Sequence, residues 1–121
     1  MKRIPIKTNE DKFFRQFLEL IKSIPPINKL RPKELDVLAE IMYQNNKYSD
    51  LEPNIKNTMV FNTNTRKEMR LKVGITEESF NNNLSILRRH GLLSKDNKLI
   101  PFLDTVTYKD GYKLEFTFKE S

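Results

Sequence analysis

Residues 65–80 read TRKEMRLKVGITEESF, and this stretch decides the fold. A helix is expected over residues 64–73, and Gly74 follows it as the left-handed residue that commonly ends a helix. Thr76 is the expected N-cap of the next helix, over residues 76–90, because its hydroxyl can accept from an amide of the first turn. Two short helices that cross at a small residue make up a helix-turn-helix, so we predict that unit here.

The second helix of this unit carries its apolar residues at 80, 84 and 87, which share one face. Gly91 is expected to end it. The apolar pairs 92–93 and 99–100 then flank a polar turn of sequence KDNK, residues 95–98. Short apolar runs on either side of a polar turn are typical of a β-hairpin, which we predict over residues 92–100.

The flanking segments supply further elements. Apolar residues at 13, 14, 17, 18, 21 and 24 predict an N-terminal helix over residues 9–24, whose aromatic face lies either in the core or against a second copy of the chain. Another helix is expected to begin near Pro32 and to fray at Asn45 and Asn46. Residues 48–58 are expected to form a loop, with room for one helical turn after Pro53, and residues 59–61 a minor strand. Alternating apolar residues over 114–118 predict a second β-hairpin, with strands at 106–108 and 112–118 and its turn at 109–111.

Residues 30–100 resemble the winged helix-turn-helix family of DNA-binding proteins. The resemblance is carried by residues 65–80 and by LSILRRHGLL, residues 84–93, where a basic helix end leads through a glycine into the predicted hairpin. More loosely, the chain resembles small bacteriophage-encoded winged-helix proteins. The family implies a mainly α fold with a β wing (α+β) in a single domain, residues 1–121. That domain would comprise the N-terminal helix 9–24, the winged unit 30–100 and a β-hairpin tail 101–121.

In that family the second helix of the unit enters the major groove and the wing touches the DNA backbone. The resemblance therefore implies a non-enzymatic regulator of transcription or replication, which reads duplex DNA with helix 76–90 and contacts the backbone with the wing 92–100. The DNA-binding residues expected from this mapping are Arg66, Lys67, Arg70, Asn81, Asn82, Ser85, Arg88, Arg89, Lys95 and Lys98.

Composition limits the other possibilities. The 121 residues carry a net charge of +6, and residues 61–98 hold eight basic against four acidic side chains, a balance that favours nucleic acid as a partner. The chain has no cysteine, a single histidine (His90) and three isolated glycines. We therefore expect no metal site, no cofactor and no enzyme active site. No apolar stretch approaches the roughly 20 residues that span a bilayer, and no signal peptide is visible, so a cytoplasmic location or a virion is expected.

Two acidic residues support an alternative. Glu77 and Glu78 begin the helix that would enter the groove, and there they would repel phosphate. The alternative is a protein-interaction or structural module, such as a bacteriophage assembly or virion component. Both interpretations leave room for a homodimer through the N-terminal helix and for a protein partner in a larger assembly.

Overall fold

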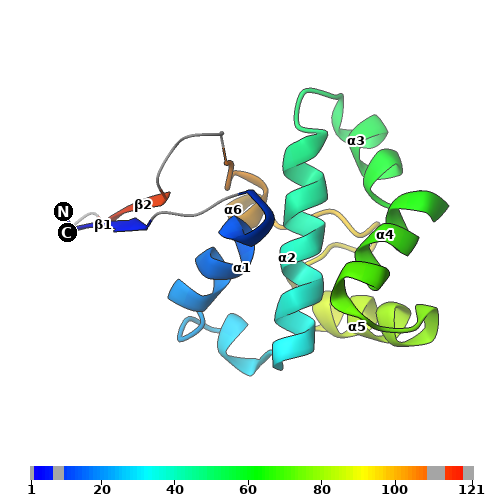
Figure 1. Ribbon diagram of the computed structural model, residues 1–121, viewed down its shortest axis with the longest axis horizontal. Coiled ribbons are helices and arrows are strands. Elements are labelled where there is room, and N and C mark those ends of the chain that lie inside the picture. Colours follow the sequence, from blue (N-terminus) through cyan, green and yellow to red (C-terminus); the bar gives the residue numbers. More distant parts are fainter. Residues whose placement is uncertain (1, 7–9, 109–113, 119–121) are drawn as a thin grey trace.

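The fold is built around one long central helix. A computed structural model of the chain describes residues 2–6, 10–108 and 114–118, and it places α2 (Pro32–Lys47) in the middle of the helical body (Figure 1). Around it pack α1 (Glu10–Leu20), α3 (Pro53–Val60), α4 (Thr63–Val73), α5 (Glu77–Arg89) and the short α6 (Pro101–Asp104). A 3-10 turn, Ile27–Lys29, joins α1 to α2.

One apolar core joins α1, α2, α4, α5 and α6, and Phe61 at the end of α3 packs against it. Val37, Leu38 and Ile41 of α2 are almost completely buried. Met69 of α4 and Leu87 of α5 are fully buried in the same cluster. The apolar face of α1 belongs to this core as well, through Phe13, Phe14, Phe17 and Leu18, together with Ile21 just after the helix. The face that the sequence left open as a contact with a second copy is therefore covered by the chain's own helices.

The helix boundaries follow from capping. Asn62 accepts a hydrogen bond from the amide of Thr65, and Thr76 accepts one from the amide of Ser79, so each residue caps the helix that follows it. Gly74 ends α4 in the left-handed conformation, with φ at 79°. The predicted break between two helices at Gly74 is thus confirmed. The N-terminal helix ends earlier than expected, at Leu20 rather than at residue 24.

The predicted α+β fold with a β wing is wrong, because the helical body contains no strand within residues 10–108. Where the wing was expected, Leu93 and Leu99 form one isolated β-bridge. The amide of Ser94 donates to the carbonyl of Lys98, which closes a tight turn directly beyond that bridge. Pro101 then begins α6, so the chain enters a helix before a ladder of strand length can form. We call residues 94–98 the polar loop.

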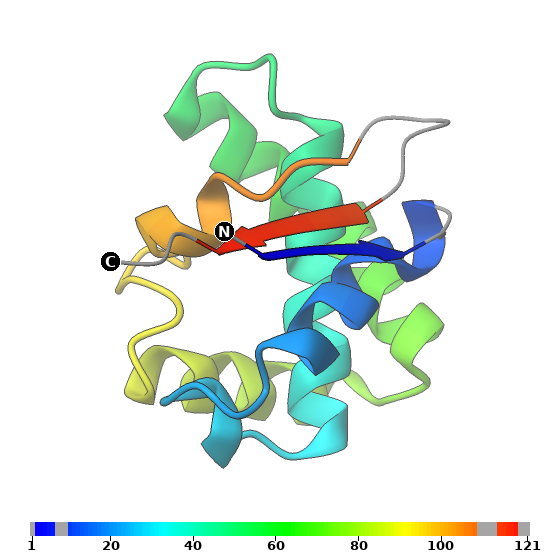
Figure 2. The same ribbon diagram turned by 90° about the vertical axis from the view of Figure 1, so that its left-hand side faces the viewer.

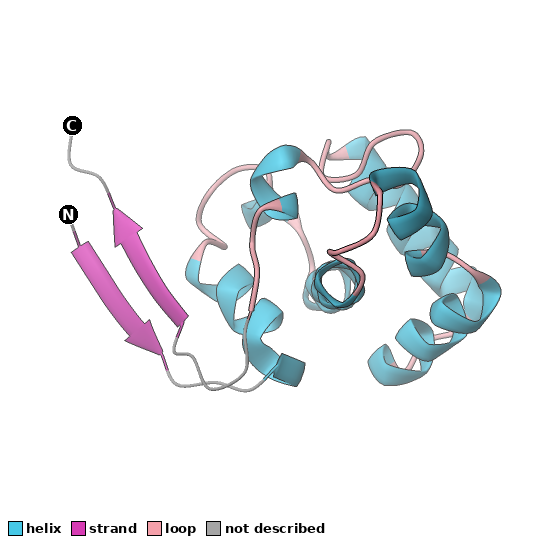
Figure 3. Cartoon of the chain, turned by 90° about the horizontal axis from the view of Figure 1, so that it is seen from above, coloured by secondary structure: helices cyan, strands magenta, loops and turns pink. Residues whose placement is uncertain are grey.

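The predicted C-terminal hairpin is also wrong. Residues 106–108 form no strand, and the turn expected at residues 109–111 lies outside the described residues. The strand that does form, β2 (Leu114–Phe118), pairs antiparallel with β1 (Lys2–Ile6) at the other end of the chain, with Ile4 opposite Phe116. Figure 3 shows this two-stranded sheet at one edge of the helical body, and in Figure 2 the same sheet lies in front of the helices. The alternation at 114–118 therefore predicted a strand correctly but not its partner.

The expectation for residues 48–61, within the helical body, is wrong. The segment expected to be a loop followed by a minor strand at residues 59–61 instead holds α3. Pro53 occupies the first turn of α3, where a missing amide proton costs nothing, and Glu52 accepts from the amide of Ile55. The apolar residue Val60 at the end of α3 is buried. The apolar run at residues 59–61 therefore reflects the packing of a helix end and not a strand.

Candidate nucleic-acid interface

The helices α4 and α5 meet at a groove that gathers several of the predicted site residues. Arg66, Lys67 and Arg70 of α4 line it, together with Asn81 of α5. Thr63, Glu77 and Phe80 complete the lining. The groove exists because Gly74 turns the chain between the two helices, so that they run in different directions (Figure 1).

The outer face of α5 is polar throughout. Its exposed residues are Glu77, Glu78, Asn81, Asn82, Ser85 and Arg89, spaced mainly by three and four along the helix. Phe80, Leu84 and Leu87 occupy the opposite, buried face. The third asparagine of the run, Asn83, is also buried, and its amide donates to the carbonyl of Ser79 at 2.7 Å. The asparagine run is therefore divided, with two members facing solvent and one packed inside.

Arg66 is held in place by its own chain. Its Nε donates to the carbonyl of Phe61 at 2.9 Å, and its guanidinium lies over the Phe61 ring, 5.6 Å from the centroid. Its Nη1 reaches Oδ1 of Asn81 at 3.4 Å. This arginine thus connects the end of α3 to α5, and within the described residues no hydrogen bond uses the Asn81 Nδ2 group.

Four of the predicted basic residues have no such engagement. Within the described part of the chain, the structure gives Lys67, Arg70, Arg89 and Lys95 no hydrogen bond and no ion pair. Lys67, Arg89 and Lys95 are exposed, and Arg70 is half-buried. These four cations are the ones available to an anionic partner without breaking an internal contact.

The remaining two predicted basic residues fasten the polar loop. Arg88 donates from Nη1 to Oδ1 of Asn97 and from Nη2 to Oγ of Ser85, the latter at 3.1 Å. Lys98 donates from Nζ to Oδ1 of Asn54 on α3 at 2.9 Å. Lys95 and Lys98 do not line the α4–α5 groove, and Lys98 lines a separate cavity between α2, α3 and α6.

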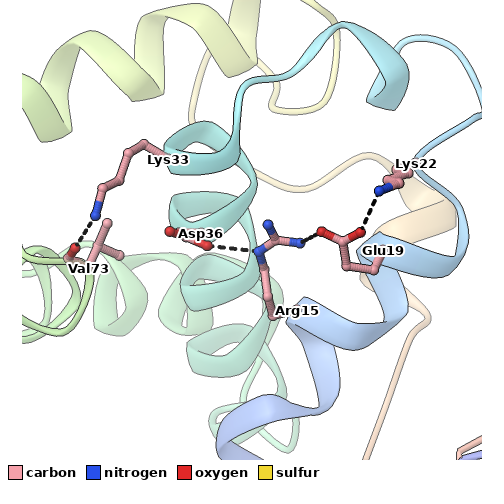
Figure 4. Close-up of polar contacts among 6 residues, drawn as sticks. All are labelled: Arg15, Glu19, Lys22, Lys33, Asp36 and Val73. Atoms are coloured by element: carbon pink, nitrogen blue, oxygen red, sulfur yellow. Dashed lines mark hydrogen bonds and ion pairs between the residues drawn. The ribbon is translucent and has the colours of Figure 1, made fainter.

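The turn at Gly74 is supported from α2. Lys33 donates from Nζ to the carbonyl of Val73, the last residue of α4, at 2.9 Å (Figure 4). A lysine near a helix C-terminus is favoured by the partial negative charge of the exposed carbonyls. About two helical turns further along α2, Glu40 lies 3.3 Å from the Lys72 ammonium. Both contacts fix the end of α4, and therefore the position of α5 beyond it.

The first helix is fastened to α2 by Arg15. Its Nε donates to Asp36 at 2.8 Å, and its Nη1 donates to Glu19 at 2.6 Å (Figure 4). Burial disfavours the charged guanidinium, but the hydrogen bonds with Asp36 and Glu19 outweigh it and raise the pKa of Arg15. Hydrogen bonds from Lys22 and from Arg15 lower the pKa of Glu19.

Comparison with known proteins adds no relative. No protein-family profile matches this sequence, and no characterised protein or solved structure matches it significantly. Among the described residues, no helix combines the length and the apolar character needed to cross a bilayer.

Four of the groove residues were predictable from the sequence, but the contacts that hold them in place were not. The capping glycine, the two N-caps and the buried stripe at 80, 84 and 87 are local patterns, and each can be read from the sequence. The contacts of Arg66 with Phe61, Lys33 with Val73 and Lys98 with Asn54 join residues on different elements. No spacing in the sequence signals them, because they depend on how the helices pack.

Proposed function

We propose that this chain is a non-enzymatic DNA-binding protein that docks α4 and α5 on double-stranded DNA, with the polar face of α5 in the major groove. One observation supports this most strongly. Three basic side chains and the Asn81 amide converge on the α4–α5 groove, directly beside the exposed asparagines of α5. A helix of this width and polarity fits the major groove, where amides can read base edges. The biological role we propose for this contact is regulation of transcription or replication.

The contacts divide into two kinds. Lys67, Arg70, Arg89 and Lys95 lack internal partners among the described residues, and we assign them to phosphates. Asn82 is exposed, and no hydrogen bond within the described residues engages the oxygen or the nitrogen of its amide, so it can pair with N6 and N7 of adenine. Phosphate contacts fix the position of the protein, whereas base contacts carry the sequence preference.

A salt series tests the proposal. Four phosphate contacts predict that log affinity falls with log salt at a slope of about −3.6, and replacing Lys67 and Arg70 with glutamine reduces it to about −1.8. The readout is fluorescence anisotropy of a labelled duplex of mixed sequence. The matched control is Lys47→Gln, an exposed lysine at the end of α2 remote from α5 (Figure 1). Equal slopes for the double variant and the control would refute the assigned face.

A second candidate function has its own support. Glu77 lines the groove, where it opposes phosphate, and Leu71 on the surface of α4 is 60% exposed. An exposed leucine beside a charged groove also suits a protein partner, which makes an interaction or assembly module the alternative. Leu71→Ser separates the two: it removes a protein contact but leaves the salt slope for DNA unchanged.

A further inference from the structure

The polar loop is held to the helical body by side chains rather than by strand pairing. On one side Asn57 of α3 donates from Nδ2 to the carbonyl of Asp96 at 2.9 Å, and Lys98 donates to Asn54. On the other side Arg88 of α5 donates to Asn97. Asn97 adopts a left-handed backbone with φ at 64°, a conformation that asparagine tolerates better than most residues.

We propose that Arg88 is a positioning residue, which sets the polar loop and its exposed Lys95 relative to α5, and that it does not itself contact DNA. This inference rests on the proposed function. It changes the role expected for Arg88 from the sequence, and it leaves the adjacent Arg89 as the contacting arginine. The two residues are neighbours in one helix turn, yet Arg88 is half-buried and bonded twice, whereas Arg89 is exposed.

The chemistry of arginine explains why this position needs it. The planar guanidinium presents separate N–H groups in a fixed fork, so one side chain bonds Ser85 on its own helix and Asn97 in the loop together. A lysine ammonium keeps the charge but lacks that fork. A residue that only attracts phosphate is replaceable by lysine, while a residue that bridges two fixed acceptors is not. The substitution therefore distinguishes the two roles.

The first test uses the free protein and needs no DNA. The amides of Ser94 and Asn97 bond within the loop turn, to the carbonyls of Lys98 and Ser94, and their hydrogen exchange reports on loop order. We expect Arg88→Ala and Arg88→Lys to raise the exchange rates of these amides by about fivefold or more. Arg89→Ala is the matched control and leaves them unchanged. Unchanged exchange in Arg88→Ala, or full protection in Arg88→Lys, would overturn the proposal.

A second variant identifies the partner. Asn97→Gly keeps the left-handed backbone but removes the oxygen that accepts from Arg88, so it reproduces the exchange behaviour of Arg88→Ala. If the two residues act through one contact, the double variant exchanges no faster than either single variant. If the exchange rates in the double variant instead rise by the product of the two single effects, the contact between Arg88 and Asn97 is contradicted.

The last test uses DNA, and it distinguishes a failure of this inference from a failure of the proposed DNA-binding function. Duplex binding weakens in Arg88→Ala and is not restored by Arg88→Lys, since the loop that carries Lys95 is no longer fixed. Restoration by lysine would show that Arg88 contacts phosphate directly. If the unaltered chain binds no duplex, the proposed function fails, while the exchange results still decide the role of Arg88 in the loop.

Discussion

At the scale of single residues, Gln44 stands out as a polar side chain in the core. It is fully buried in α2, and within the described structure neither its Oε1 nor its Nε2 has a hydrogen-bond partner. A buried amide without partners loses its bonds to water and gains nothing in return. The Gln44 side chain therefore lowers the free energy of unfolding, because it lies in the apolar core between the helices.

We expect Gln44→Met to raise the free energy of unfolding by about 1–3 kcal/mol, because methionine fills a similar volume without a desolvation penalty. Urea denaturation followed by circular dichroism measures the change. Gln44→Asn, which keeps the amide and shortens the side chain, is the control and is destabilising. A Met variant less stable than the original chain would mean that the amide has a partner.

Gly74 is the residue on which the arrangement of α4 and α5 depends. Its φ of 79° lies in the left-handed region, and a Cβ at this position would meet no atom within 4 Å. The cost of a side chain here is therefore conformational rather than steric. Gly74→Ala should lower the free energy of unfolding by about 1 kcal/mol, and Gly74→Asn by less, since asparagine enters this region more readily. Equal losses in the two variants, measured by urea denaturation, would contradict this reason.

At the scale of elements, α1, α2, α4 and α5 were predictable, whereas α3, α6 and the pairing of β2 were not. The boundary between α4 and α5 follows from Gly74 and Thr76, whose effects are local. The apolar pairs around the polar loop gave the pattern of a hairpin, but Pro101 begins α6 too soon for strands to extend. The alternation over 114–118 also indicated a strand, but β2 pairs with β1, more than a hundred residues away. The alternation of apolar and polar residues indicates which face of a strand is apolar, but it does not indicate with which other strand it pairs.

The ion pairs that Glu19 makes with Arg15 in α1 and with Lys22 just after α1 give an element-scale prediction. The pKa of Glu19 is lowered by its hydrogen bonds with Lys22 and Arg15. A carboxylate with a folded-state pKa below its unfolded value stabilises the fold above the unfolded pKa, near 4.3, and loses that contribution as the pH falls through the folded pKa. Glu19→Gln should therefore reduce the loss of stability between neutral and acidic pH, as measured by urea denaturation at several pH values. An unchanged pH dependence would show that the ion pairs of Glu19 contribute nothing to the stability of the fold.

At the scale of the whole molecule, the helical body shares one core that runs from α1 to α6. Leu18 in α1 is as completely buried as Leu87 in α5. Leu18→Ala should consequently cost about 2–5 kcal/mol of unfolding free energy, the range for a large aliphatic side chain removed from a core, and Leu87→Ala a similar amount. Thermal and urea unfolding should remain single cooperative transitions. A small effect of Leu18→Ala alone would mean that α1 is a separate arm and is available to a second copy.

The assignment of the outer face of α5 as the DNA contact is tested most directly by an NMR titration of the isotope-labelled chain with a short DNA duplex. We predict that amide shifts change mainly at Asn81, Asn82, Ser85 and Arg89 and along the α4 side of the groove, and that they vanish in high salt. Changes confined to α1 and α6, or no changes at low salt, would contradict the proposed function.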